Sequence, residues 1–247
     1  MRLEEMTWYE VQSYLKISRG IILPTGSVEQ HGPIGLIGTD AICAREISWT
    51  AANLCKAIVA PTISYAPANF NMSFPGTVSL SPTVYEGIIH DVLKSLSHHG
   101  FEKIYVLNGH GANLEILENV VKSRQFDVQI RSWWDFDAVN VLRNQFYGDW
   151  EGMHATPSEI SITQHTHRIV NMDGLDPPDK LSAQYIAAHS GDKHGPPDDH
   201  RANFPDGRVG SHSGLAQPEH GRRLLEAAAM AVANDYRSFV DKSSAFI

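Results

Sequence analysis

The chain alternates short apolar runs with longer stretches in which apolar residues recur every three or four positions. Short runs bounded by turn-forming residues predict buried strands, and the three-to-four spacing predicts helices with one buried face. The expected strands are Ile21–Leu23, Ala57–Ile63, Lys103–Leu107 and Val128–Ser132. The expected helices are Thr7–Ile17, with Thr7 as its cap, and then Asp40–Lys56, Pro82–His98, Leu114–Lys122 and Gln217–Val240.

This alternation of strands and helices is typical of an α/β fold, in which a mostly parallel sheet carries helices on both faces. The pattern changes between Asn171 and Gly214, where Pro, Gly, Asp and His dominate. Because this long excursion is too polar for the core, it is predicted to be a lid or a contact between subunits. No second domain is indicated, so residues 1–247 are expected to form a single domain.

Composition narrows the classes of function. The chain has 247 residues, 42% of them hydrophobic, which is enough for a sizeable core. Its formal net charge is −8 and it has no basic stripe, so a nucleic-acid partner is not expected. No apolar run approaches the ~20 residues of a membrane span, and the N-terminal residues do not resemble a signal peptide. Cys43 and Cys55 lie three helical turns apart and are not expected to bridge. A cytoplasmic enzyme is the expectation.

Three candidate metal ligands follow the first predicted strand. Glu29 and His31 lie in the loop after it, and Asp40 lies at the start of the next helix. Carboxylate and imidazole groups together suit zinc, manganese or iron, and open α/β sheets bind ligands at the carboxyl ends of their strands. The structural alternative for Asp40 is a helix N-cap.

Two further segments carry candidate groups. His110 lies between two glycines directly after the third predicted strand, a position that packing explains poorly. His154 and Glu159 lie in the segment His-Ala-Thr-Pro-Ser-Glu. There Thr156 can cap a helix with Pro157 at its first position, which would make Glu159 a capping-box residue instead of a ligand.

Several motifs resemble those of the creatininase (creatinine amidohydrolase) family, in order and over most of the chain. They are Thr7-Trp8-x-Glu10, Gly26-Ser27-x-Glu29-Gln30-His31-Gly32-Pro33, Asp40, Phe74-Pro75-Gly76-Thr77, Asn108-Gly109-His110-Gly111, His154-Ala155 with Glu159, Gly207-x-x-Gly210-Ser211 and Glu219-His220-Gly221-Arg222. The order and spacing of so many motifs make the resemblance specific. It implies a three-layer α/β/α fold, two divalent metal ions per chain and a homohexamer.

The resemblance also implies two sets of metal ligands. The first set is Glu29, Asp40 and His110, and the second is His31, the shared Asp40 and Glu159. In creatininase itself the further glutamate lies two residues after the histidine that matches His110, where this chain has Ala112. Glu159 is assigned instead because relatives with a similar glycine-rich loop take the ligand from the matching position.

Other positions bear on the substrate. By resemblance His154 shuttles a proton or stabilises the oxyanion, and Trp150 lines the substrate pocket, although Trp150 could equally be a core aromatic residue. Met153 stands where the family often has an acidic residue, and Asn71 stands where a histidine is common. Creatinine itself is therefore not the expected substrate.

These features predict a metal-dependent amidohydrolase that cleaves a carbon–nitrogen bond of a small cyclic amide or formamide through a metal-bridged hydroxide. One alternative is a metallopeptidase that trims a short modified peptide. Another is a catalytically inactive scaffold or binding subunit, which metal content would distinguish from an enzyme. The expected partners are a small-molecule substrate and further copies of the chain.

Overall fold

The computed structural model describes residues 1–122 and 125–241. Within these residues, four parallel strands form one sheet in the order β2-β1-β3-β4. The strands are β1 (Gly20–Thr25), β2 (Ile58–Val59), β3 (Lys103–Asn108) and β4 (Val128–Ser132). The prediction of a parallel sheet is therefore confirmed.

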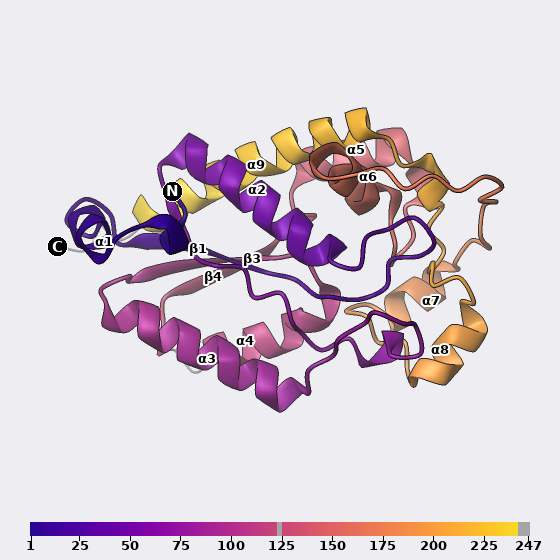
Figure 1. Cartoon of the computed structure of the whole chain (residues 1–247), viewed down its shortest axis with the longest axis horizontal. Coiled ribbons are helices and arrows are strands. Elements are labelled where there is room, and N and C mark those ends of the chain that lie inside the picture. Colours follow the sequence, from indigo (N-terminus) through magenta and orange to yellow (C-terminus); the bar gives the residue numbers. More distant parts are fainter. Residues whose placement is uncertain (123–124, 242–247) are drawn as a thin grey trace.

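Helices cover both faces of this sheet and make three layers (Figure 1). One face carries α2 (Thr39–Cys55), α5 (Asp137–Phe146), α6 (Pro157–Thr166) and α9 (Pro218–Asp241), and the other carries α3 (Pro82–His98) and α4 (Leu114–Lys122). Alternate strand residues point to opposite layers: Ile22 packs with residues of α2 and α9, whereas Ile21 packs with residues of α3. The expected α/β/α arrangement is confirmed.

Local sequence explains the ends of two elements. α1 (Trp8–Tyr14) begins after the predicted cap Thr7, which forms a capping box with Glu10, but it ends before the predicted Ile17. β2 is also shorter than predicted. Pro61 has no backbone N–H to donate, so the ladder cannot continue through it.

The strand order creates a topological switch point between β1 and β3. After β1 the chain passes through α2 to β2 on one side, whereas β3 lies on the other side of β1. The loops at the carboxyl ends of β1 and β3 therefore diverge, and the crevice between them is where open α/β sheets bind ligands. α2 begins there with Gly38 as its N-cap, so Asp40 lies in the first turn and is not the cap.

The segment from Asn171 to Gly214 contains two short helices, α7 (Ala183–Ala188) and α8 (Pro197–Asn203), near the loop end of the sheet (Figure 1). His194 and His200 of this segment are buried, and their rings lie 5.0 and 5.1 Å from the ring of Phe70. The expectation that the excursion is too polar for the interior is wrong for these residues, because aromatic contacts bury the two imidazoles.

α9 packs closely on α6 and helps to fix its position. A Cβ added to Gly221 of α9 would lie 1.9 Å from the backbone oxygen of Ser161 in α6, so this contact requires glycine.

The short 3-10 turns are η1 (Leu3–Glu5), η2 (Asn69–Asn71), η3 (Gly111–Asn113), η4 (Gly148–Trp150) and η5 (Ser213–Leu215). In the described ranges, no helix is both long and apolar enough to cross a membrane.

Candidate metal centre

The crevice between β1 and β3 gathers acidic and imidazole side chains around one buried carboxylate. Asp40, which enters from the first turn of α2, is 3% exposed. Its Oδ1 lies 2.8 Å from Nε2 of His31, in the loop after β1, and its Oδ2 lies 2.9 Å from Nδ1 of His110, in the loop after β3. Asp40 thus lies between two histidines that come from different strands of the sheet.

The histidines of this cluster are oriented by backbone carbonyls. One ring nitrogen of each is paired with a carbonyl oxygen: His31 Nδ1 with Glu29 at 3.0 Å, His110 Nε2 with Pro67 at 2.7 Å and His154 Nε2 with Gln30 at 2.7 Å. When that nitrogen carries the proton, it donates to the carbonyl and the second nitrogen presents a lone pair. This second nitrogen faces carboxylate oxygens in each case; for His154 it is Nδ1, 3.5 Å from Glu29 Oε1. Metal-binding histidines are held by their other nitrogen in this way.

The buried carboxylates of the cluster also favour a bound cation. Glu29 is fully buried, and within the described part of the chain neither of its carboxylate oxygens, nor Oδ2 of Asp40, has a well-directed hydrogen-bond donor. Burying a carboxylate without such partners costs free energy. The lone pair of a histidine nitrogen that faces the carboxylate adds repulsion, unless a proton or a metal ion lies between the two atoms. The donor set of carboxylate oxygens and imidazole nitrogens fits a divalent ion.

The shifted pKa values of these side chains indicate where the cluster favours positive charge. Burial alone would lower the pKa of His31, but the charge of Asp40 and its hydrogen bond outweigh burial and raise it to about 10. Burial raises the pKa of Glu159 to about 7. Burial, together with the charge on His31, lowers the pKa of His154 to about 3. The cluster therefore favours positive charge at the position between Asp40 and the two histidines that flank it.

Three overlapping groups of possible ligands are found among the described residues, with ligand atoms within 4.8 Å of one another. They are Glu29–Asp40–His110, His31–Asp40–Glu159 and Glu29–His31–His154. The first two groups have the same members as the two ligand sets that the sequence resemblance implies, and both include Asp40. All five residues predicted as ligands thus come together, along with His154.

Glu159 forms the predicted capping box and also reaches the cluster. The Thr156 N–H donates to Glu159 Oε1 at 2.5 Å, and the Glu159 N–H donates to Thr156 Oγ1 at 3.3 Å. The same Oε1 lies 3.9 Å from His31 Nε2. A carboxylate has two oxygens with several lone pairs, so capping and metal binding are compatible roles for this side chain.

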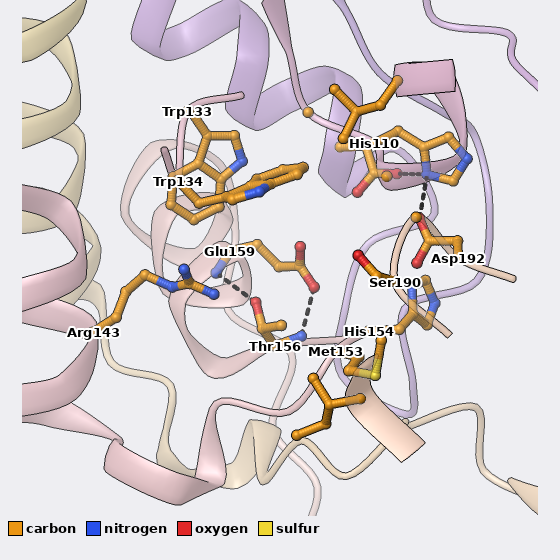
Figure 2. A pocket seen from close by; sticks show the side chains of 16 residues that line it. His110, Trp133, Trp134, Arg143, Met153, His154, Thr156, Glu159, Ser190 and Asp192 are labelled. Atoms are coloured by element: carbon orange, nitrogen blue, oxygen red, sulfur yellow. Dashed lines mark hydrogen bonds and ion pairs between the residues drawn. The ribbon is translucent and has the colours of Figure 1, made fainter. Parts of the chain in front are cut away.

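A cavity of about 200 Å³ adjoins the cluster (Figure 2). Asp40, His110, His154 and Glu159 line it on the side of the candidate ligands. Trp133, Trp134 and Arg143, which follow β4 or lie on α5, line another side. The Arg143 Nε donates to Glu151 at 3.0 Å, and its Nη1 donates to Asn140 at 2.8 Å.

Trp150 is not among the described residues that line this cavity, so its place in the substrate pocket stays a prediction. It belongs to η4, where its ring lies 5.7 Å from the ring of His212 and 4.7 Å from the Lys180 Nζ. The turn of η4 directs Trp150 toward those residues, whereas the end of β4 places Trp133 and Trp134 at the cavity. Their sequence signal, two adjacent tryptophans after a predicted strand, does not by itself say which way they point.

Asp192 is a cavity residue that the sequence did not single out. It lies in the loop after α7, where its Oδ2 accepts the Ala112 N–H at 3.0 Å and lies 3.7 Å from His110 Nδ1. Figure 2 shows its carboxylate beside His110. Asp192 lies in the polar excursion, which carries no motif around it, so only the folded chain brings it to the site.

Comparison with known proteins gives a family match over nearly the whole chain. The sequence profile of the creatininase family, described as creatinine amidohydrolase, matches residues 4–235. The creatinine amidohydrolase of Pseudomonas putida is 27% identical over 180 residues, which are 64% of this chain and 68% of that protein. The mycofactocin precursor peptide peptidase of Mycolicibacterium smegmatis is 30% identical over 119 residues, so the match spans about half of each chain, at 46% and 48%.

Solved structures show the same fold. A structure described as creatininase with manganese has a TM-score of 0.75 and 22% identity, and it covers 97% of this chain and 98% of its own. A zinc form of a creatininase mutant has a TM-score of 0.74 at 22% identity, with 97% and 98% coverage. At these identities the likeness establishes the fold alone.

The position of Asp40 generates the first prediction. Asp40→Ala should lose stoichiometric metal, because the substitution removes the carboxylate that both ligand groups share. Metal analysis of protein stripped with a chelator and reloaded with Zn²⁺ or Mn²⁺ measures this directly. Asp91→Ala, which removes an exposed carboxylate on α3, should load like the wild type. An Asp40→Ala protein that still holds two ions per chain would contradict the shared position.

The second prediction separates the two roles of Glu159. Glu159→Gln keeps an oxygen that can accept the Thr156 N–H but removes the charge, so metal content and activity should fall while the unfolding free energy without metal changes by less than ~0.5 kcal/mol. Thr156→Ala is the matched variant: it should cost about 1 kcal/mol in stability and retain metal. Metal analysis and urea unfolding measure both effects. A metal-replete, active Glu159→Gln protein would leave capping as the role of Glu159.

Proposed function

The chain belongs to the creatininase family, and from this premise we propose that it is a metal-dependent amidohydrolase that cleaves a carbon–nitrogen bond of a small cyclic amide or formamide. The proteins it resembles include hydrolases. The observation that carries the proposal is the buried Asp40 carboxylate between two histidines whose other nitrogens are paired with backbone carbonyls. This arrangement directs the free ring nitrogens of the two histidines toward the Asp40 carboxylate, and a cation bound there would be coordinated by both kinds of group.

We assign the metals as two divalent ions, Zn, Mn or Fe. Glu29, Asp40 and His110 would hold one ion, and His31, Asp40 and Glu159 would hold the other. When bound, such ions lower the pKa of a water molecule toward neutrality and polarise the carbonyl of the substrate. The descriptions of related structures with manganese and with zinc support this choice of metals.

The role of His154 follows from its hydrogen bond. Its Nε2–H donates to the Gln30 carbonyl at 2.7 Å, so neutral His154 keeps Nδ1 as an acceptor, 3.5 Å from Glu29 Oε1. An acceptor can orient the attacking water, whereas stabilisation of an oxyanion requires a donor. Of the two roles implied by resemblance, the structure therefore supports proton acceptance or orientation of water.

The cavity supports a small substrate other than creatinine. Trp133 and Trp134 line it, and their indole rings offer an aromatic wall for a planar group. Met153 lines the cavity where the family often has an acidic residue, so a polar contact available to creatinine is missing.

Two alternatives have specific observations attached. The identity to a mycofactocin precursor peptide peptidase makes the trimming of a short modified peptide the second candidate function. An inactive scaffold is the third, and the presence of all five candidate ligands within one buried cluster argues against it. We also propose that the protein acts in the cytoplasm, the compartment expected from its sequence.

A substrate panel tests the proposed activity. Metal-loaded protein should hydrolyse at least one of formanilide, 2-pyrrolidinone and succinimide, and should leave creatinine intact. Activity should disappear with chelator and in Asp40→Ala, because both remove the ions. Chromatographic detection of the ring-opened or deformylated product is the measurement. Cleavage of short peptides with no cleavage of any of these amides would support the peptidase instead, and a protein that purifies without metal would support the scaffold.

We further propose a homohexamer, with α1 as part of its contacts. Trp8 and Tyr9 are 65% and 64% exposed on this helix and stack on each other at 3.6 Å, an apolar surface typical of interfaces. Light scattering should give a mass about six times that of the 27.3 kDa chain, and Trp8→Arg should reduce it. A monomeric wild type with full activity would contradict the assembly.

A further inference from the structure

Two hollows of the molecule meet at the side chain of Asp192. This residue lines the cavity of the metal centre, and it also lines a second hollow of about 470 Å³. Gly111 lines the cavity, whereas the next residue along the chain, Ala112, lines the second hollow. The boundary between the two hollows therefore runs where Asp192 lies against the loop after β3. The second hollow is the outer groove, and its lining includes Pro67, Phe70, Pro82, Ile116, Lys193 and His194.

The carboxylate of Asp192 fills the gap at this boundary. Its Oδ2 accepts the Ala112 N–H at 3.0 Å, and its Oδ1 lies 3.6 Å from Nε2 of His194 in the outer groove. A Cβ added to Gly111 would lie 2.3 Å from Asp192 Oδ2, so the loop approaches the carboxylate as closely as its backbone allows. The Asp192 side chain is 11% exposed, and Figure 2 shows it beside His110. Both of its oxygens are thus occupied by protein groups on the two sides of the boundary.

The outer groove suits an apolar group. Pro67, Phe70, Pro82 and Ile116 bring apolar side chains to its lining. Its charged residue Lys193 lies 3.7 Å from a carboxylate oxygen of Glu115, so this cation already has a partner. An alkyl chain that reached the groove from the cavity would be stabilised by burial of its apolar surface. Such a chain would first have to displace the Asp192 carboxylate from the Ala112 N–H.

We infer that Asp192 is a specificity-determining residue, which closes the cavity toward the outer groove and so favours a compact amide over one with a long apolar substituent. This inference rests on the proposed function, because that function places the substrate in the cavity. A long substituent finds no apolar surface past Asp192, whereas a compact substrate does not need any. Opening the boundary should therefore give long substituents an advantage that they lack in the wild type.

Linear alkylureas probe the boundary without turnover, because a urea resembles a small amide but resists hydrolysis. Calorimetry on zinc-loaded protein gives the dissociation constants of ethylurea and octylurea. In the wild type, octylurea should bind no more than about threefold tighter than ethylurea. In Asp192→Gly it should bind at least about tenfold tighter than in the wild type, because several methylene groups become buried in the outer groove. Ethylurea should bind both proteins within about twofold.

The conformation of Asp192 allows matched variants. Its φ is 57°, in the left-handed region that glycine and asparagine adopt readily, so neither substitution strains the loop. Asp192→Asn keeps the volume of the side chain and an oxygen that accepts the Ala112 N–H, and it should bind both ureas as the wild type does. This variant separates closure from charge. Both variants should retain metal, because Asp192 is absent from the ligand groups found among the described residues.

A variant on the groove side tests closure independently of Asp192. Ile116 is half-buried on α4, so a lysine there can place its ammonium group at the groove and still reach water. In the otherwise wild-type protein, Ile116→Lys should leave octylurea binding unchanged, because the groove is closed to the ligand. Combined with Asp192→Gly, it should remove the gain in octylurea affinity.

The outcomes distinguish this inference from the proposed function. The expected urea affinities without hydrolysis of any amide would contradict the proposed activity and support closure by Asp192. An active enzyme whose octylurea affinity is unchanged by Asp192→Gly, or is lowered by Ile116→Lys alone, would overturn the inference alone. Loss of metal in Asp192→Asn would also overturn it, because Asp192 would then act on the metal centre.

Discussion

The structure depends on burying the charge of one carboxylate, that of Asp40. The cost of removing this group from water is offset by His31 and His110, whose nitrogens lie 2.8 and 2.9 Å from its two oxygens. Each histidine must approach from a different loop, and each is oriented by a carbonyl elsewhere in the backbone. Errors of an ångström in these loops would leave a buried charge unpaired, so the surrounding fold has to be rigid.

The sheet supplies that rigidity. β1 and β3 are neighbours paired over six residues, so the loops that carry His31 and His110 leave the sheet side by side. α2 enters the same crevice and brings Asp40 in its first turn. α6 brings Glu159, and its position depends on the close contact at Gly221 of α9. Distinct layers of the fold thus converge on one point.

The walls of the cavity come from parts of the chain that the metal centre does not need. Trp133 follows β4, Arg143 lies on α5 and Asp192 lies in the excursion after α7. Relatives can therefore share the centre and differ in these walls. Such a division between a fixed centre and variable walls fits a family whose relatives include a creatinine amidohydrolase and a peptide peptidase.

The sequence by itself determined the four strands of the sheet, helices α1, α2, α3, α4 and α9, the caps at Thr7 and Thr156, and the list of candidate ligands; it did not predict α5, α7 or α8. These features depend on periodicity, on local hydrogen bonds and on motifs, and each of these signals comes from residues that are close together in the sequence. Only the tertiary structure decided that Glu159 can cap a helix and reach His31, and that Trp133 rather than Trp150 lines the cavity. It also brought Asp192 against Ala112. The direction of a side chain and the docking of a polar loop depend on packing between distant segments, which no local pattern encodes.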